Sequence, residues 1–174
     1  RRVWVYLPPN YEKSEEAYPV LYMHDGQNIF DKSTSFSGEW EVDETLNKLY
    51  EQYDFKLIVI GIDNGQEKRL DEYSPWVHSE YGGGEGEAYV DFLVNTLKPY
   101  VDDNYRTLSG REYTVIMGSS MGGLISYYAA LKYPNVYGKA GVFSPALWFS
   151  EKSYDYAKTK GNLKETKMYF LAGG

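Results

Sequence analysis

Short apolar segments alternate along the chain with segments in which apolar residues recur at helical spacing. Apolar runs of strand length occupy residues 3–7, 19–23, 56–62, 114–117, 139–143 and 167–172. Most of them are apolar at successive positions, which is typical of strands buried on both faces of a parallel sheet. Two stripes at helical spacing lie between the runs, formed by Val42, Leu46, Leu49, Tyr50 and Tyr53, and by Val90, Leu93, Val94, Leu97 and Val101. The alternation predicts an α/β fold with a mostly parallel sheet and helices on both faces.

The connecting segments are polar or rich in glycine and proline. Residues 69–76 are aromatic and contain a proline, so we expect a loop there. The glycine-rich run at 82–86 does not follow a strand and is therefore no dinucleotide-binding fingerprint. We interpret this run as a flexible entry to a helix at 87–101, whose last turn Pro99 is expected to weaken. Residues 151–160 predict a further short helix.

The run at 114–117 leads into a serine-containing turn. Gly118-Ser119-Ser120-Met121-Gly122 matches G-x-S-x-G, the nucleophile elbow, in which a serine occupies a strained turn between a strand and a helix. Side chains two residues before and after Ser120 would collide, so glycines are expected there, and Gly123 lets the helix pack close to the sheet. Backbone N–H groups at the helix N-terminus would stabilise an oxyanion. A purely structural glycine-rich turn is the alternative; the almost wholly apolar helix at 124–133 favours the nucleophile.

A second polar segment, His24-Asp25-Gly26-Gln27-Asn28, follows the run at 19–23. In open α/β sheets, ligands bind at the carboxyl ends of the strands, and in hydrolases of this kind such a loop supplies an oxyanion N–H. His24 could instead join Asp25 and Asp31 at a metal ion, but no third soft ligand accompanies them. We therefore expect a hydrogen-bonded structural histidine, with neither metal nor cofactor.

Composition and charge argue against several classes of function. The 174 residues suit a single domain, and the net charge of −7 with a pI near 4.9 argues against a nucleic-acid partner. There is no apolar run near 18 residues, so we expect no transmembrane helix or membrane partner. The chain has no cysteine, which excludes thiol catalysis and leaves both a cytoplasmic and a secreted location open. The 19 tyrosines and 4 tryptophans suit sugar or aryl substrates, although packing is the commoner reason for such residues.

Several motifs together carry a resemblance to the esterase branch of the α/β-hydrolase superfamily. That branch includes enterochelin-esterase-like hydrolases, feruloyl and acetylxylan carbohydrate esterases, and the esterase D group. The matching stretches, in the family's order, are Arg2-Val-Trp-Val-Tyr-Leu-Pro8, Pro19-Val-Leu-Tyr-Met-His-Asp-Gly-Gln-Asn28, Trp40-Glu-Val-Asp43, Gly61-Ile-Asp-Asn64, Arg69 with Glu72-Tyr-Ser-Pro75, Gly118-Ser-Ser-Met-Gly-Gly123 and Ser144-Pro-Ala-Leu-Trp148. They span nearly the whole chain, so their joint specificity is high.

The resemblance implies roles for individual residues. Ser120 matches the nucleophile and Met121 the residue whose N–H points into the oxyanion hole. The loop from His24 to Gln27 matches the other side of that hole, with Gly26 and Gln27 as its donors. The positions that match the flanks of the substrate cleft are His24, Asp25, Arg69, Trp76 and Trp148.

The family's catalytic acid and histidine match no position here. The acid follows the strand at 167–172 and the histidine lies further on, while no histidine follows Ser120. We therefore expect residues 1–174 to be one α/β-hydrolase domain, truncated before both groups.

The sequence thus predicts a serine hydrolase of carboxylic esters, acting through an acyl-enzyme on sugar-linked or aryl esters. Two alternatives stay open: a non-catalytic binding module on the same scaffold, and an acyltransferase in which another hydroxyl replaces water.

Overall fold

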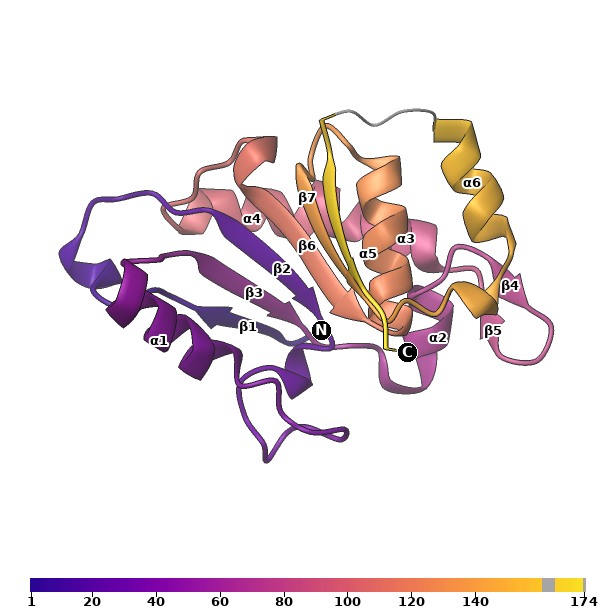
Figure 1. Ribbon diagram of the computed structural model, residues 1–174, viewed down its shortest axis with the longest axis horizontal. Coiled ribbons are helices and arrows are strands. Elements are labelled where there is room, and N and C mark those ends of the chain that lie inside the picture. The colour runs from indigo at the N-terminus through magenta and orange to yellow at the C-terminus, as the bar shows by residue number, and fades with distance from the viewer. Residues whose placement is uncertain (161–164, 174) are drawn as a thin grey trace.

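A six-stranded sheet organises the chain. The structure, a computed structural model, describes residues 1–160 and 165–173 (Figure 1). The sheet order is β1-β3-β2-β6-β7-β8, in which β1 runs antiparallel to β3 and all other neighbours are parallel. The strands are β1 (Val3–Tyr6), β2 (Val20–His24), β3 (Ile58–Ile62), β6 (Thr114–Ser119), β7 (Lys139–Phe143) and β8 (Lys167–Leu171). Each predicted strand is confirmed, as is the mostly parallel sheet.

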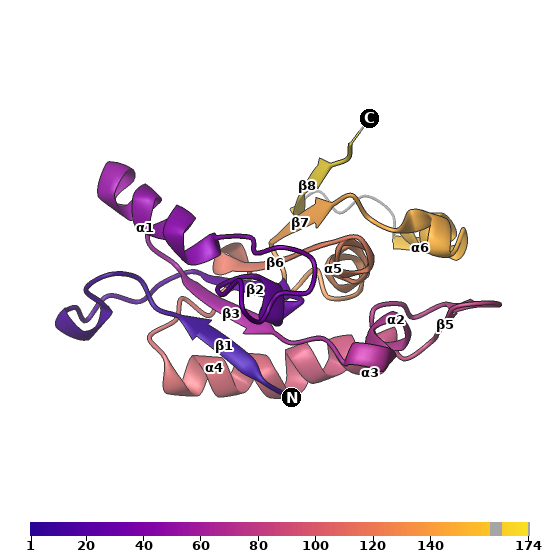
Figure 2. The ribbon, with the colours of Figure 1, turned by 90° about the horizontal axis from the view of Figure 1, so that it is seen from below.

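Helices cover both faces of this sheet, as the sequence predicts. Figure 2 shows α1 (Val42–Tyr53) on one face and α3 (Gly86–Phe92), α4 (Lys98–Asn104), α5 (Met121–Lys132) and α6 (Lys152–Lys160) on the other. Alternate residues of β2 serve the two layers: Tyr22 belongs to the larger core with α3 and α5, while Leu21 and Met23 pack with Leu46 of α1. Helix α5 is the most enclosed of these helices, with ten of its twelve residues buried.

The structure confirms one of the two predicted apolar stripes and corrects the other at one residue. In the stripe on α3 and α4, Val90 and Leu93 are fully buried, so that prediction is confirmed. On α1, Leu46 is buried, but Tyr53 is 72% exposed, so its place in the stripe was wrong. Tyr53 is the last residue of α1, and Leu46 is the one residue of this helix that is buried.

Two connecting segments also depart from expectation. The predicted loop at 69–76 begins with a short helix, α2 (Arg69–Glu72). The glycine-rich run forms strand β5 (Gly82–Gly83), which pairs with β4 (Val77–His78) in a hairpin rather than a flexible entry. Gly83 adopts φ 103°, and a Cβ there would lie 2.3 Å from the Trp76 carbonyl oxygen, so only glycine closes this hairpin without a clash.

The helix after the hairpin is longer than predicted. It continues from α3 through a π-helical segment (Leu93–Leu97) into α4 and ends at Asn104. Pro99 lies in the first turn of α4, directly after the π-helical segment, where its missing N–H is tolerated. The proline therefore does not weaken a final turn, because the helix ends five residues later.

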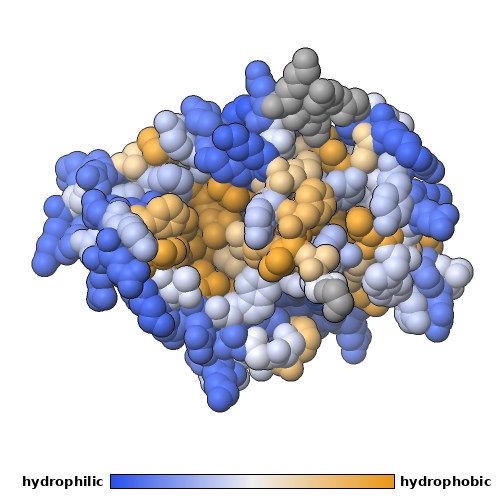
Figure 3. All heavy atoms as spheres, in the orientation of Figure 1, coloured by the Kyte–Doolittle hydropathy of each residue, from blue (hydrophilic) through white to orange (hydrophobic). Residues whose placement is uncertain are grey.

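One region of the sheet carries an open apolar surface. A groove lined by Val115, Met117, Gly141, Phe143 and Tyr169 crosses β6, β7 and β8 on the face that also bears α1. Figure 3 shows this apolar surface in orange over the middle of the molecule, where these three strands lie in Figure 1. Within the described ranges, no helix combines the length and the apolar character needed to cross a bilayer.

Candidate active site

Ser120 occupies the turn between β6 and α5, as the elbow motif predicts. Its backbone has φ 57° and ψ −121°, a conformation that L-residues adopt only where the surroundings enforce it. The Ser120 N–H donates to the Phe143 carbonyl oxygen at 3.0 Å, and its carbonyl oxygen accepts from the N–H of Leu124 and of Ala146. These three backbone hydrogen bonds hold the strained turn and leave the Ser120 side chain exposed.

The glycines around Ser120 permit a close approach of strand and helix. A Cβ on Gly118 would lie 2.6 Å from the carbonyl carbon and oxygen of Gly122, which confirms the expected collision. A Cβ on Gly122 would meet the Cβ of His24 at 3.3 Å, a milder contact. A Cβ on Gly123 would lie 2.8 Å from the Phe143 carbonyl oxygen, so this glycine does let α5 pack against the sheet.

A cavity of about 270 Å³ opens beside Ser120. It brings together four of the predicted site residues, His24, Asp25, Arg69 and Ser120. Its other lining residues are Asn28, Ile29, Phe36, Ser37, Trp40 and Ser119, none of which the sequence analysis assigned to the site. The matched stretch that begins at Trp40 was the available signal. The ring of Trp40 packs against the ring of Phe143 on β7, with 6.1 Å between the two ring centroids.

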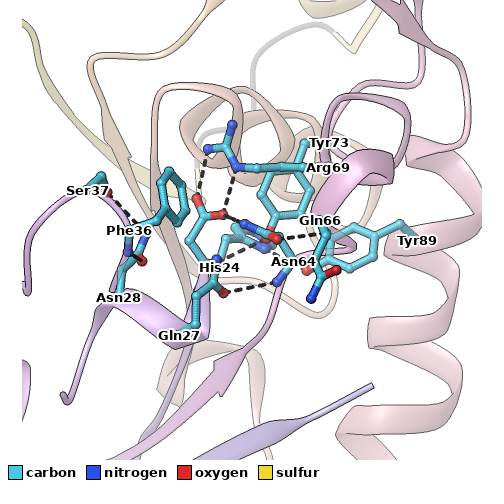
Figure 4. A network of polar contacts seen from close by, with 11 residues as sticks. His24, Gln27, Asn28, Phe36, Ser37, Asn64, Gln66, Arg69, Tyr73 and Tyr89 are labelled. Atoms are coloured by element: carbon cyan, nitrogen blue, oxygen red, sulfur yellow. Dashed lines mark hydrogen bonds and ion pairs between the residues drawn. The ribbon is translucent and has the colours of Figure 1, made fainter. Parts of the chain in front are cut away.

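Asp25 is the centre of the polar network at this cavity, and its partners Arg69, Asn64 and Tyr73 are labelled in Figure 4. Its carboxylate accepts from Nε and Nη2 of Arg69 at 2.8 and 2.9 Å, and from Nδ2 of Asn64 at 2.6 Å. The backbone of Asp25 is also fixed, because its N–H donates to the Tyr73 hydroxyl at 3.0 Å. Burial opposes the charged form of Arg69, but the hydrogen bonds and the charge of Asp25 raise its pKa. Arg69 therefore stays a cation, and its remaining nitrogen, Nη1, has no partner among the described residues.

His24 lies beneath this network as a neutral side chain. Its Nδ1 is 2.8 Å from the Tyr89 hydroxyl, whereas its buried Nε2 has no hydrogen-bond partner in the described ranges. Burial lowers the pKa of His24 to about 3, with Asp25 opposing this shift and Arg69 adding to it. An imidazole with so low a pKa is a poor general base near neutral pH. The interpretation as a hydrogen-bonded structural histidine fits this environment.

The predicted oxyanion donors lie at two helix N-termini. Met121 is the first residue of α5, and Gly26 and Gln27 begin a 3₁₀ helix (Gly26–Asn28) directly after β2. The first N–H groups of a helix have no partner within it and are free to bind an anion. Gly26 also packs tightly on β3, since a Cβ there would lie 2.7 Å from the carbonyl carbon of Gly61. Their role as donors stays a prediction.

The two tryptophans expected beside the cleft do not line this cavity. Trp76 packs edge-on against Tyr128 and Tyr156, which places it between the hairpin and helices α5 and α6. Trp148 is 67% exposed and packs edge-on against Tyr81 of the hairpin loop. Trp76 is used for packing, and contact of Trp148 with substrate stays a prediction.

His78 lies in the same hairpin. Its Nδ1 accepts from the N–H groups of Glu80 and Tyr81 at 3.1 and 3.3 Å, and its ring stacks on Tyr81. It does not line the cavity at Ser120.

Metal-ligating geometry occurs elsewhere in the described residues. The carboxylates of Glu39, Asp43 and Glu44 lie within 4.8 Å of one another at the start of α1. His24, Asp25 and Asp31 do not form such a group within the described ranges. Asp25 is already occupied by Arg69, which supplies the positive charge that a metal would otherwise bring.

The chain is similar to several known proteins. It is 33% identical to "Uncharacterized protein YbbA" of Bacillus subtilis, over 86% of this chain and 58% of that protein. It is 24% identical to "Endo-1,4-beta-xylanase/feruloyl esterase" of Xylanibacter ruminicola, over 87% of this chain and 20% of that protein. The crystal structure of an IroE-like serine hydrolase from Shewanella oneidensis superposes with a TM-score of 0.78 at 25% identity, covering 97% of this chain and 54% of that one.

The coverage figures show that this chain spans little more than half the length of YbbA and of the Shewanella hydrolase. The sequence model of the family described as "Putative esterase" matches residues 1–171, nearly the whole chain. The chain therefore belongs to this esterase family.

Proposed function

We propose that the protein hydrolyses carboxylic esters through an acyl-enzyme on Ser120. The observation that carries this proposal is the exposed Ser120 side chain, held in a strained turn at the rim of a cavity. The serine oxygen attacks the ester carbonyl and its proton passes to a general base. Collapse of the tetrahedral intermediate breaks the bond to the alcohol, which leaves with that proton, and water then releases the acid.

The negative charge that develops on the carbonyl oxygen needs donors. We propose the N–H of Met121, at the start of α5, as one donor, and those of Gly26 and Gln27, at the start of the 3₁₀ helix after β2, as the others. Each such donor contributes about 3 kcal/mol to transition-state stabilisation in hydrolases of this type.

We assign the general base to neither histidine of this sequence. Both are committed elsewhere: His24 is buried against Tyr89, and the Nδ1 of His78 accepts two backbone N–H groups.

The substrate class we propose is sugar-linked or aryl esters. Phe36 and Trp40 give the cavity an aromatic wall, and Arg69 offers its free Nη1 to an oxygen on the substrate. The likeness to a xylanase/feruloyl esterase supports the same class. A marked preference for long-chain acyl esters over feruloyl and acetyl-sugar esters would refute it.

A fluorophosphonate probe tests the nucleophile. On the full-length protein the probe should label Ser120, and Ser120→Ala should abolish both labelling and ester turnover. Ser119→Ala is the matched control, because Ser119 lines the same cavity but precedes the strained turn, and it should still be labelled. Labelling that survives Ser120→Ala would contradict the assignment.

The two alternatives are separated by the products. A binding module on this scaffold would bind esters without any Ser120-dependent turnover. An acyltransferase would yield a new ester when an alcohol acceptor is added, whereas a hydrolase yields the free acid.

A further inference from the structure

A second, larger cavity adjoins the cavity at Ser120. Its volume is about 760 Å³, and Phe36 and Arg69 line both spaces. We call it the outer groove. Because the two cavities share a wall, a substrate whose ester lies at Ser120 can extend past Arg69 into the outer groove. The smaller cavity of about 270 Å³ has room for one side of the ester only.

The charges that line the outer groove cancel. Arg2 and Arg69 contribute two cations, and Asp63 and Glu67 contribute two carboxylates. The lining therefore offers many polar atoms but no net charge to attract an ionised ligand.

Two of these polar side chains have no hydrogen-bond partner among the described residues. The amide of Gln66 and the carboxylate of Glu67 make no side-chain hydrogen bond to the described residues. The backbone of Gln66 is nevertheless fixed, because its N–H donates to Oδ1 of Asn64 at 2.9 Å and its φ is 56° (Figure 4). Phe36, which also lines the groove, is 69% exposed and presents a bare aromatic ring.

An aromatic ring in the same groove as an uncommitted amide and carboxylate, in a lining of zero net charge, fits a neutral group rich in hydroxyls. We infer that the outer groove binds the hydroxyl-rich alcohol side of the ester, a sugar unit, with Gln66 as a specificity-determining residue. This inference rests on the proposed ester hydrolysis at Ser120.

Two esters that share an acyl group and differ in the alcohol allow the contribution of the outer groove to be measured. We would measure kcat/KM for acetylated xylotriose and for 4-nitrophenyl acetate on the full-length protein, and take their ratio. Gln66→Ala should lower the ratio about fivefold, the value of one neutral hydrogen bond, through KM. Gln66→Gly should do the same, and because glycine adopts positive φ without strain it separates loss of the side chain from backbone damage. Gln52→Ala, an exposed glutamine on α1, is the matched control and should leave the ratio unchanged.

Direct binding gives a second, independent measurement. In the Ser120→Ala background, xylotriose should shift the NMR signals of the Gln66 and Asn64 side-chain amides, and Gln66→Gly should weaken that binding. An unchanged ratio in both Gln66 variants would overturn the inference, as would binding of an anionic ligand such as 2,3-dihydroxybenzoate in place of xylotriose. Absence of Ser120-dependent turnover would instead refute the proposed hydrolysis, and the binding measurement would still decide the role of the groove.

Discussion

The pairing of Asp25 with Arg69 makes a quantitative prediction about stability. Both N–H···O contacts are short, at 2.8 and 2.9 Å, and the two side chains are only 13% and 20% exposed. Asp25→Asn keeps the shape of the side chain but replaces one acceptor oxygen by an NH₂ group. That group faces a guanidinium nitrogen, so a donor meets a donor and one hydrogen bond is lost.

The expected cost lies between two measured classes. Exposed ion pairs contribute about 0–1 kcal/mol, whereas removing one partner of a buried pair costs about 3–5 kcal/mol. The partial exposure of Asp25 and Arg69 places Asp25→Asn at about 2 kcal/mol of lost unfolding free energy. Arg69→Gln should cost less, because the stranded carboxylate keeps its hydrogen bond from Asn64.

A double-mutant cycle with urea unfolding of the full-length protein measures the coupling. Asp25→Asn and Arg69→Gln together should destabilise by about 1 kcal/mol less than the sum of the two single variants. The matched control is the pair of Lys68 and Glu85, which is at least half exposed on both sides and should show no measurable coupling. A coupling between Asp25 and Arg69 as small as that of the control would refute the reasoning.

The remaining predictions concern the elbow, the buried histidine and the isolated chain. Gly118→Ala should destabilise the protein by about 1–3 kcal/mol and more than Gly122→Ala, because its Cβ meets backbone at 2.6 Å rather than a side-chain carbon at 3.3 Å; equal denaturation midpoints would contradict this. The folded protein keeps His24 neutral down to about pH 3, whereas the unfolded chain protonates it below about pH 6.5. The free energy of unfolding should therefore decrease as the pH is lowered between these values, by up to about 1.4 kcal/mol per pH unit, and His24→Gln should flatten this dependence. Residues 1–174 expressed alone should bind an apolar dye at the open sheet face and hydrolyse 4-nitrophenyl acetate no faster than Ser120→Ala does; Ser120-dependent turnover that His24→Ala abolishes would show that His24 is the base.

Sequence reasoning predicted best those features whose physical cause is local. The elbow depends on a few neighbouring residues, so Ser120 and its glycines could be placed from the motif alone. The strands could be predicted because burial on both faces demands uninterrupted apolar runs. The position of Tyr53 could not, since the point at which α1 leaves the sheet depends on the lengths of both elements.

Contacts between distant segments explain most of what was missed. Arg69 was assigned to the cleft, but its pairing with Asp25, 44 residues away, has no signature in the sequence. Phe36 and Trp40 line the cavity from a loop without periodicity, where the matched stretch that begins at Trp40 was a signal for that residue and nothing marked Phe36. Trp76 was misjudged for the converse reason, because an aromatic residue in a loop packs on helices that the sequence does not place beside it.

The most deeply buried side chains of the site are uncharged, and its charged side chains lie above them. This arrangement explains the role of the deepest layer. His24 and Tyr89 are buried and uncharged, and burial raises the pKa of Tyr89 further above its usual value. A charged residue at that depth would incur a desolvation penalty that no neighbour offsets. The charges instead begin one layer above, at Asp25, whose backbone rests on Tyr73. The neutral layer thus fixes Asp25, and Asp25 orients Arg69 through two of its three nitrogens at the wall between the two cavities.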